Sequence, residues 1–260
     1  EGDAQRRQAA MKDSTRLQLA SAIAFVAALE VLCRTGIITA FTMMPPSQMV
    51  VGLYRAFATG SILPDMRSTL VGVLMAAVAA IVSGLVAGSV IFTLPRVRRT
   101  LDPLFTSYYA VPIWAFYPMF VYLFGLTDTP KLVIGYLYAV VAMIVNTLNG
   151  LDRVPRVLRK TATVMKLGRA EALLRIVLPS AVPHIFTGVK LAISYAFIGV
   201  VGSEFILATS GLGHQIHWAY TSFDNEALYS MVLFIVLLAI AINVSLSAWE
   251  GALMRRRGRS

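Results

Sequence analysis

Uninterrupted runs of apolar residues constrain the fold of this chain more than any other feature of its sequence. The longest reach about 20 residues, the length at which an α-helix crosses a bilayer core of roughly 30 Å. A transmembrane strand would instead alternate apolar and polar residues over about ten positions. Charged residues make up 14% of the 260 residues, whereas a soluble domain holds about a quarter. The sequence therefore predicts an all-α, polytopic membrane helix bundle.

The apolar runs predict six membrane helices in a single transmembrane domain over residues 1–260. The expected spans are 17–35, 68–94, 104–126, 131–150, 186–209 and 228–250. We expect the first span to be retained, because it is longer than the apolar core of a signal peptide and the CRTG after it is a poor cleavage site. Between the first two spans, Pro45 and Pro46 break the chain. Ser47 is expected to cap a short amphipathic helix over 48–58.

Lysines and arginines gather in the loops between alternate spans. The basic clusters comprise Arg6, Arg7, Lys12 and Arg16; Arg96, Arg98 and Arg99; Arg153, Arg156, Arg159, Lys160, Lys166, Arg169 and Arg175; and Arg255, Arg256, Arg257 and Arg259. The other loops and their edges hold only Arg34, Arg55, Arg67 and Lys131. Because basic loops stay on the cytoplasmic side, both termini and the loop 151–185 are expected to face the cytoplasm. This arrangement accounts for the net charge of +10 without a nucleic-acid partner.

The segment 166–188 reads KLGRAEALLRIVLPSAVPHIFTG and is a charged insert between two apolar spans. A helix over 163–177 would carry two apolar strips, one through Met165, Ala172 and Ile176, the other through Leu167, Ala170, Leu174 and Val177. A helix lying in the membrane interface needs one apolar face, so two strips favour a helix held between its own bundle and a second protein. Pro179 and Pro183 are expected to end this helix and delay the next. A solvated loop that only obeys the positive-inside rule is the alternative.

The insert resembles the signature cytoplasmic loop of bacterial ATP-binding-cassette (ABC) importer permeases. Gly168, Leu178 and Pro179 match its G-x(9)-L-P spacing, and the triplet 162–164, Ala-Thr-Val, stands where that family has Glu-Ala-Ala. The resemblance covers about residues 45–250 and includes LDPLFTSYYAVPIWAFYPMFVYLFG (101–125), SYAFIGVVGSEFI (194–206) and SGLGHQI (210–216). The chain is similar to the branch that includes permeases for nitrate, sulfonates and taurine.

This resemblance implies a type I ABC importer permease fold in the bacterial inner membrane, surrounded by lipid. It implies a coupling helix that sits in a groove of a cytoplasmic ABC ATPase dimer. The residues expected to couple to the ATPase are Met165, Lys166, Leu167, Gly168, Arg169, Ala170, Glu171, Leu174, Leu178 and Pro179. It further implies a second permease subunit, identical or paralogous, and an extracytoplasmic solute-binding protein. The solute would be a small anion such as a sulfonate, taurine, nitrate or an aromatic acid.

The chain contains no G-x-x-x-x-G-K-[ST], the loop that cradles nucleotide phosphates. We therefore expect no cofactor on this chain, with ATP and Mg bound by the partner ATPase. The three histidines and single cysteine form no pattern of a metal site or internal disulfide. No nucleophile, base and carboxylate stand in a catalytic arrangement, so the chain is not expected to be an enzyme.

Four side chains in the expected spans are candidates for the translocation path: Trp114, Tyr117, Asn146 and Glu204. A carboxylate at membrane depth usually faces protein or water, so Glu204 lines the path, pairs structurally or reaches the outer interface. Asparagine commonly bonds between membrane helices, and aromatic residues commonly pack or anchor at the interface. Each candidate thus also has a structural interpretation.

An ion-coupled secondary transporter or channel is the alternative function. Such a protein needs intramembrane carboxylates paired with cations, inverted repeats or broken helices. Glu204 is the one candidate carboxylate, and the sequence shows no repeat. A membrane enzyme or an assembly scaffold is the third hypothesis.

Overall fold

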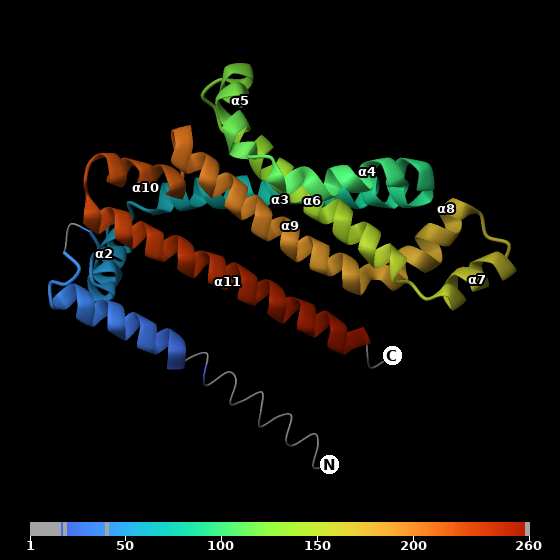
Figure 1. Ribbon diagram of the computed structural model, residues 1–260, viewed down its shortest axis with the longest axis horizontal. Helices are drawn as coiled ribbons and strands as arrows, with labels where there is room; N and C mark the ends of the chain where they lie inside the picture. Colours follow the sequence, from blue (N-terminus) through green and yellow to red (C-terminus); the bar gives the residue numbers. More distant parts are fainter. Residues whose placement is uncertain (1–16, 18–19, 40–41, 258–260) are drawn as a thin grey trace, which may run out of the picture. The chain divides into compact units, whose positions relative to one another are not determined.

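The computed structural model describes residues 17, 20–39 and 42–257, and no strand occurs in these ranges. After a helix over 20–34, the elements are α2 (Pro46–Ala58), α3 (Leu63–Thr93), α4 (Pro95–Ser107), η1 (Tyr108–Ala110), η2 (Ile113–Phe116), α5 (Tyr117–Phe124), α6 (Thr129–Asp152), α7 (Arg156–Val164), α8 (Arg169–Ala172), η3 (Leu173–Val177), α9 (Leu178–Leu207), α10 (Leu212–Thr221) and α11 (Asn225–Arg257) (Figure 1). The all-α fold class is confirmed. The basic residues of the N-terminal arm and Arg259 lie outside the described residues.

The chain packs as two compact units. One comprises Glu1–Ser61 and Trp218–Phe234, the other Ile62–His217 and Ile235–Ser260. Helix α11 contributes to both units. The single transmembrane domain expected for the chain stays a prediction.

Four helical segments of the described chain are long and apolar enough to cross a membrane. They are Leu63–Thr93, Thr129–Asp152, Leu173–Ile206 and Asn225–Ala252, and they contain most of the second, fourth, fifth and sixth expected spans. Of the first expected span, 17–35, the described residues 17 and 20–34 are helical.

The continuous helix predicted over 104–126 is wrong. Helix α4 ends at Ser107, and two short 3₁₀ turns precede α5. The break lies at Val111, which is extended at φ −79° and ψ 123°, directly before Pro112. Proline disfavours the α conformation of the preceding residue and cannot donate a backbone hydrogen bond. A short apolar helical stretch, Ile113–Phe124, remains in place of a full span.

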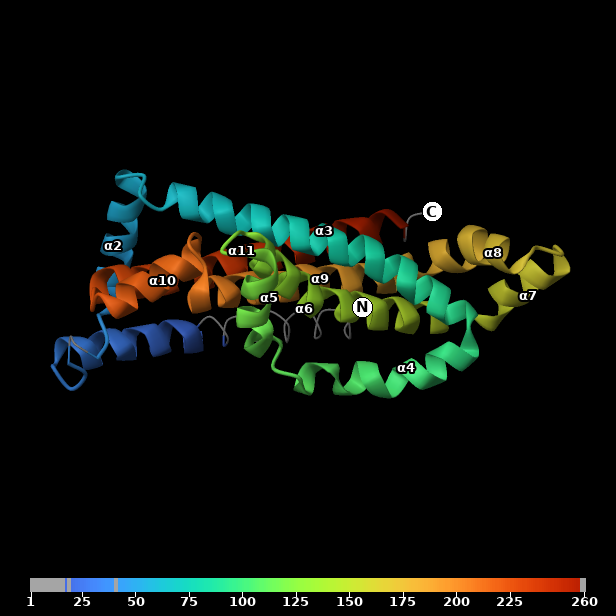
Figure 2. The same cartoon turned by 90° about the horizontal axis from the view of Figure 1, so that it is seen from above.

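The core of the larger unit is formed by α3, α6 and α9, which run side by side (Figure 2). Glycines bring these helices close together. A Cβ at Gly84 of α3 would lie 2.7 Å from Met143 Cβ of α6, and a Cβ at Gly199 of α9 would lie 2.8 Å from Gly135 Cα of α6. Small residues of this kind allow close packing where lipid provides no hydrophobic drive between helices.

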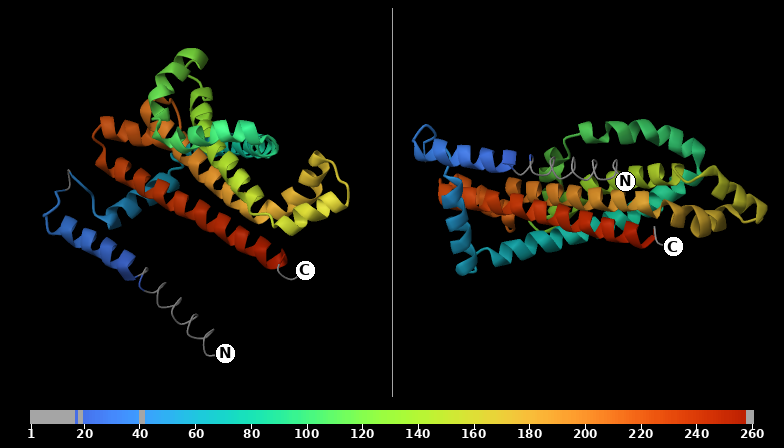
Figure 3. Two further views of the ribbon diagram at one scale, coloured as in Figure 1. Left: turned by 45° about the vertical axis from the view of Figure 1, so that its right-hand side comes forward. Right: turned by 90° about the horizontal axis from the view of Figure 1, so that it is seen from below.

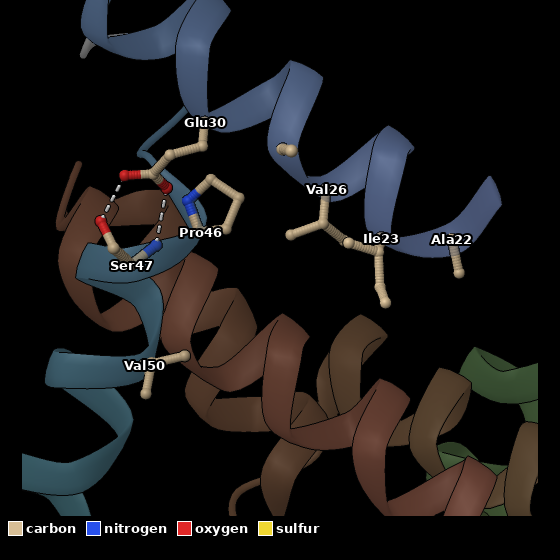
Figure 4. A pocket seen from close by; sticks show the side chains of 8 residues that line it. Ala22, Ile23, Val26, Glu30, Pro46, Ser47 and Val50 are labelled. Atoms are coloured by element: carbon tan, nitrogen blue, oxygen red, sulfur yellow. Dashed lines mark hydrogen bonds between the residues drawn. The ribbon is translucent and has the colours of Figure 1, made fainter. Parts of the chain in front are cut away.

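In the smaller unit, Ser47 does not cap α2 as predicted. The N-cap residue is Pro45, which makes no side-chain capping hydrogen bond. The Ser47 hydroxyl and backbone N–H instead donate to the two carboxylate oxygens of Glu30, at 2.7 and 3.0 Å (Figure 4). Arg34 donates to the same carboxylate at 2.5 Å. This contact fixes the start of α2 to the helix over 20–34.

Candidate functional site

The insert between α6 and α9 forms a helical hairpin, so the single helix predicted over 163–177 is wrong (Figure 3). Helix α7 ends in a turn at Lys166, which has a left-handed φ of 54°. The Leu167 N–H donates to the Ala162 carbonyl at 3.1 Å, and the Met165 N–H donates to the Thr161 carbonyl at 2.9 Å. A left-handed residue with a hydrogen bond spanning five positions is a Schellman-type helix end. The sequence hid this end because a lysine, not a glycine, occupies the left-handed position.

The helical break expected at Pro179 and Pro183 is also absent. Residues 169–207 are continuously helical through α8, the π-helical turn η3 and α9. The Leu178 N–H donates to the Leu173 carbonyl, and the Ser180 hydroxyl donates to the Ile176 carbonyl at 2.6 Å. Prolines are tolerated in membrane helices where π-type adjustments and serine side chains satisfy the freed backbone groups.

Two apolar faces occur on α7. On one face, Ala162 is buried and Leu158 packs against the core of the larger unit. On the other, Val157 and Val164 lie about two turns apart, and Val164 is 81% exposed. Met165, the first residue after α7, is exposed as well. The two apolar strips predicted over 163–177 do not form on one helix, since their residues lie in the turn and the second arm of the hairpin, whereas the helix with two apolar faces is α7.

The residues predicted to couple to an ATPase occupy the turn and the second arm of the hairpin. Five of them are exposed, namely Met165, Lys166, Gly168, Leu174 and Pro179, and three are half-buried, namely Leu167, Glu171 and Leu178. The side chains of Arg169 and Ala170 are not among those that the structure describes. Glu171 and Arg175 form an i,i+4 ion pair, at 3.0 Å. A Cβ at Gly168 would have no neighbour within 4 Å among the described residues, so this part of the chain leaves space beside the glycine.

An ion pair that the sequence did not reveal joins α4 to the end of α6, where the hairpin begins. The Arg98 guanidinium donates to both carboxylate oxygens of Asp152, at 2.9 and 2.5 Å. These hydrogen bonds raise the pKa of Arg98, although partial burial opposes them. Bidentate pairing fixes orientation as well as distance. From the sequence, Arg98 was predicted only to be one of the basic loop residues that set the orientation in the membrane.

At the other end of α9, Glu204 lies in a buried polar cluster. It is 0% exposed, and Lys131 of α6 is 2% exposed. The Lys131 Nζ lies 3.4 Å from Glu204 Oε1 and 2.8 Å from Asp128 Oδ1, and it donates to Ser68 Oγ at 2.8 Å. The Thr69 hydroxyl donates to Glu204 Oε2 at 2.7 Å. Of the three interpretations of Glu204, this geometry is that of a structural pair.

The same cluster holds the first backbone amides of α10. The N–H groups of Gly211, Leu212 and Gly213 donate to Asp65 Oδ1, Thr69 Oγ1 and Glu204 Oε2, at 2.7, 2.8 and 3.2 Å. The first amides of a helix have no partner within it. Side chains of α3 and α9 therefore cap α10 from outside its own sequence.

Two glycines make this contact possible. Gly211 has a φ of +110°, and a Cβ there would overlap the Glu204 carboxylate. A Cβ at Gly213 would overlap the Val201 carbonyl oxygen and lie 2.7 Å from Glu204 Cβ. The segment SGLG therefore requires glycine at both positions for steric reasons.

The remaining path candidates lie in two places: Trp114 and Tyr117 pack together, with Trp114 against Gly202 of α9, and Asn146 lies farther along α6. Tyr117 is buried in a small cluster with Ile113 and Ile134. The Trp114 ring is tilted by 42° to the Tyr138 ring, with ring centroids 5.2 Å apart. Asn146 lies about 22 Å along α6 from Lys131, and its amide donates to the Ala142 carbonyl of its own helix at 2.8 Å.

The sequence matches known transport proteins. Residues 80–259 match the family described as "Binding-protein-dependent transport system inner membrane component". The chain is 30% identical over 179 residues to the nitrate import permease protein NrtB of Leptolyngbya laminosa. This match covers 69% of this chain and 63% of that protein. It is 26% identical over 219 residues to the taurine transport system permease protein TauC of Escherichia coli (strain K12), which covers 82% of this chain and 80% of that protein. The chain thus spans less than two thirds of the length of the nitrate permease.

The fold is similar to solved ABC transporter structures. One is the inward-facing MetNI methionine ABC transporter, with a TM-score of 0.62, 17% identity and coverage of 81% of this chain and 99% of that chain. Another is an amino acid ABC transporter, with a TM-score of 0.62, 12% identity and coverage of 78% and 97%. The expected importer-permease fold is confirmed, and the four apolar helices make this a multi-pass membrane protein. Since the matched residues 80–259 exceed half of its length, the chain belongs to the family of binding-protein-dependent transport system inner membrane components.

Proposed function

We propose that this chain is the permease subunit of an ATP-driven importer of a small anion. A second permease subunit, identical or paralogous, completes the path, an ABC ATPase dimer hydrolyses ATP with Mg, and an extracytoplasmic protein delivers the solute. The observation that carries this proposal is the second apolar face of α7. Val157 and Val164 are exposed on a helix whose opposite face is already packed against the bundle, and Met165 directly after this helix is exposed too.

An exposed apolar face on a charged hairpin fits a protein partner better than lipid. Arg156 and Lys160 are exposed on α7, and the adjoining arm carries the exposed ion pair of Glu171 with Arg175. Basic residues of this kind favour the cytoplasmic side, where ATP is available. The hairpin is therefore proposed as the cytoplasmic docking element, with both termini on the same side.

The class of solute is proposed from the relatives. The two permeases described above are named for nitrate and for taurine, and a third relative is named a putative aliphatic sulfonates transport permease protein. All three names refer to small molecules that carry an anionic group. The proposed path residues are Trp114, Tyr117, Asn146 and Glu204. In this proposal, Glu204 contacts the path only when its ion pair with Lys131 opens.

The docking proposal is tested by placing a charge on the free face of α7. We expect Val164→Glu with Met165→Glu to prevent co-purification of the ATPase and to abolish solute uptake in proteoliposomes. The matched control is Val97→Glu, on an exposed position of α4, which should retain both. Normal ATPase association by the α7 variant would contradict the proposal.

The buried Lys131–Glu204 pair also favours a second candidate function. A paired intramembrane carboxylate is a feature of ion-coupled transporters, and α4 and α5 are separated by a break. This candidate predicts uptake by the purified chain alone under a proton or sodium gradient. We expect no uptake under these conditions, and uptake that requires the ATPase and ATP.

A further inference from the structure

We infer that Glu204 and Thr69 are positioning residues that make the start of α10 move together with the adjoining ends of α3, α6 and α9. In a binding-protein-dependent importer, this cluster would transmit the docking of the solute-loaded binding protein to the bundle. The inference rests on the proposed function, since it assumes that α10 lies on the outer side.

Hydrogen bonds attach the start of α10 to other helices. Three consecutive amides, from Gly211 to Gly213, each donate to a side chain of another helix. The Gln215 side-chain amide adds a fourth hydrogen bond, to Asp65 Oδ2 at 2.7 Å. A surface loop would bond these groups to water, whereas here the connection between α9 and α10 is attached to α3.

The centre of the cluster is shielded from solvent, whereas Asp128 at its edge is 65% exposed. Thr69 and Glu204 are fully buried, and Leu212 beside them is buried too. Moving α10 away would leave the Glu204 carboxylate without the Gly213 amide and the Thr69 hydroxyl without Leu212. Buried polar groups that lose their partners are strongly disfavoured. A displacement of α10 is therefore expected to carry the attached helix ends with it.

The chain leads away from the cluster in two directions, along α10 and along α9. Towards its C-terminal end, α10 exposes two large aromatic side chains, Trp218 and Tyr220. Exposed aromatic residues are typical anchors of protein interfaces. In the other direction, α9 extends from Glu204 back to η3 and the hairpin without interruption. One helix thus connects the cluster to the proposed ATPase-docking element.

The experiment uses the complete importer, reconstituted in nanodiscs with its ATPase and solute-binding protein. The measured quantity is the ATPase rate with solute-loaded binding protein divided by the rate without it. We expect Thr69→Val, which keeps the shape but removes the hydroxyl, to lower this ratio about fivefold or more, the lower end of typical allosteric couplings. Thr69→Ser restores the hydroxyl and should restore the ratio, and Glu204→Gln should also lower it.

Glu250→Gln is the matched control, because Glu250 pairs with Lys190 at 2.8 Å in a half-buried Lys–Glu pair far along α9 from the cluster. It should leave the ratio at the wild-type value. The inference is overturned if Thr69→Val stimulates like the wild type. It is also overturned if Thr69→Val only reduces assembly while the assembled fraction stimulates normally. If the wild-type complex itself shows no stimulation, the proposed function fails instead.

Discussion

Lys131 of α6 and Glu204 of α9 form an ion pair that is shielded from solvent, with 3.4 Å between Nζ and Oε1. Each partner has further polar neighbours, Ser68 and Asp128 for the lysine and Thr69 for the carboxylate. Burying two charges is costly unless their remaining donors and acceptors are matched. Of the Glu204 oxygens, Oε2 accepts from Thr69 and from the backbone amide of Gly213, whereas Oε1 has the Lys131 ammonium as its charged neighbour and accepts no hydrogen bond from the described residues.

Removing the lysine should be more harmful than removing the whole pair. We expect Lys131→Met to destabilise the protein by about 3–5 kcal/mol, because it leaves the Glu204 carboxylate buried without a cation. The double variant Lys131→Met with Glu204→Gln should recover part of this loss. Thermal unfolding in detergent measures both, and equal stability of the single and double variants would contradict the pairing.

The glycines of SGLG should tolerate no side chain. Gly213→Ala places a methyl group against the Val201 carbonyl, and we expect a loss of about 1–3 kcal/mol from overpacking. Gly72→Ala is the control, because a Cβ there would meet its nearest neighbour, Val200 Cγ1, at 3.4 Å. The melting temperature of Gly213→Ala should fall well below that of Gly72→Ala; similar values would mean that the loop lies elsewhere.

Gly168 should matter for association rather than for stability. Its Cβ position is open within the chain, so Gly168→Ala is expected to leave the melting temperature unchanged. If the hairpin docks closely on an ATPase, the added methyl group should weaken that association by about 1 kcal/mol, or roughly fivefold in Kd. Binding measured against the purified ATPase tests this, with Gly72→Ala as a control at the opposite end of the bundle. A drop in stability with unchanged binding would be the opposite of the expected result.

The bidentate pair of Arg98 and Asp152 should fix α4 to α6. We expect Arg98→Met to destabilise the protein by only about 1 kcal/mol, because both side chains are partly exposed and solvent weakens the pair. The charge-reversed double variant Arg98→Asp with Asp152→Arg should recover most of the loss. Additive losses in the double variant, measured by thermal unfolding, would show that the two side chains do not interact.

The long apolar helices α3, α6, α9 and α11 were predictable, because a run of apolar residues is a local property of the sequence. The effect of each proline was not. Pro103 and Pro183 lie inside helices, whereas the chain breaks at Pro112. Which proline interrupts a helix depends on whether neighbouring serines, π-type turns or other helices satisfy the freed backbone groups, and a single segment does not show this.

The contacts of the candidate site were likewise predictable only in part. The charges and spacing of the insert predict a docking element, and this stays a prediction. The single helix expected over 163–177 is wrong because the chain turns at Lys166, which has a left-handed conformation although it is not a glycine. The partners of Glu204 were not predictable. Thr69 and Lys131 are 135 and 73 residues away in the sequence, and no periodic pattern relates positions at such separations.

The helical continuity of residues 169–207 determines how far the hairpin reaches. Thirty-nine residues at 1.5 Å each make a rod about 58 Å long, whereas a bilayer with its headgroups is about 45 Å thick. Even at the common tilt of about 20°, such a rod is longer than the membrane. A rod of this length that spans the bilayer extends past the headgroups, and in the orientation proposed above the extending end carries Arg175 and adjoins the hairpin turn.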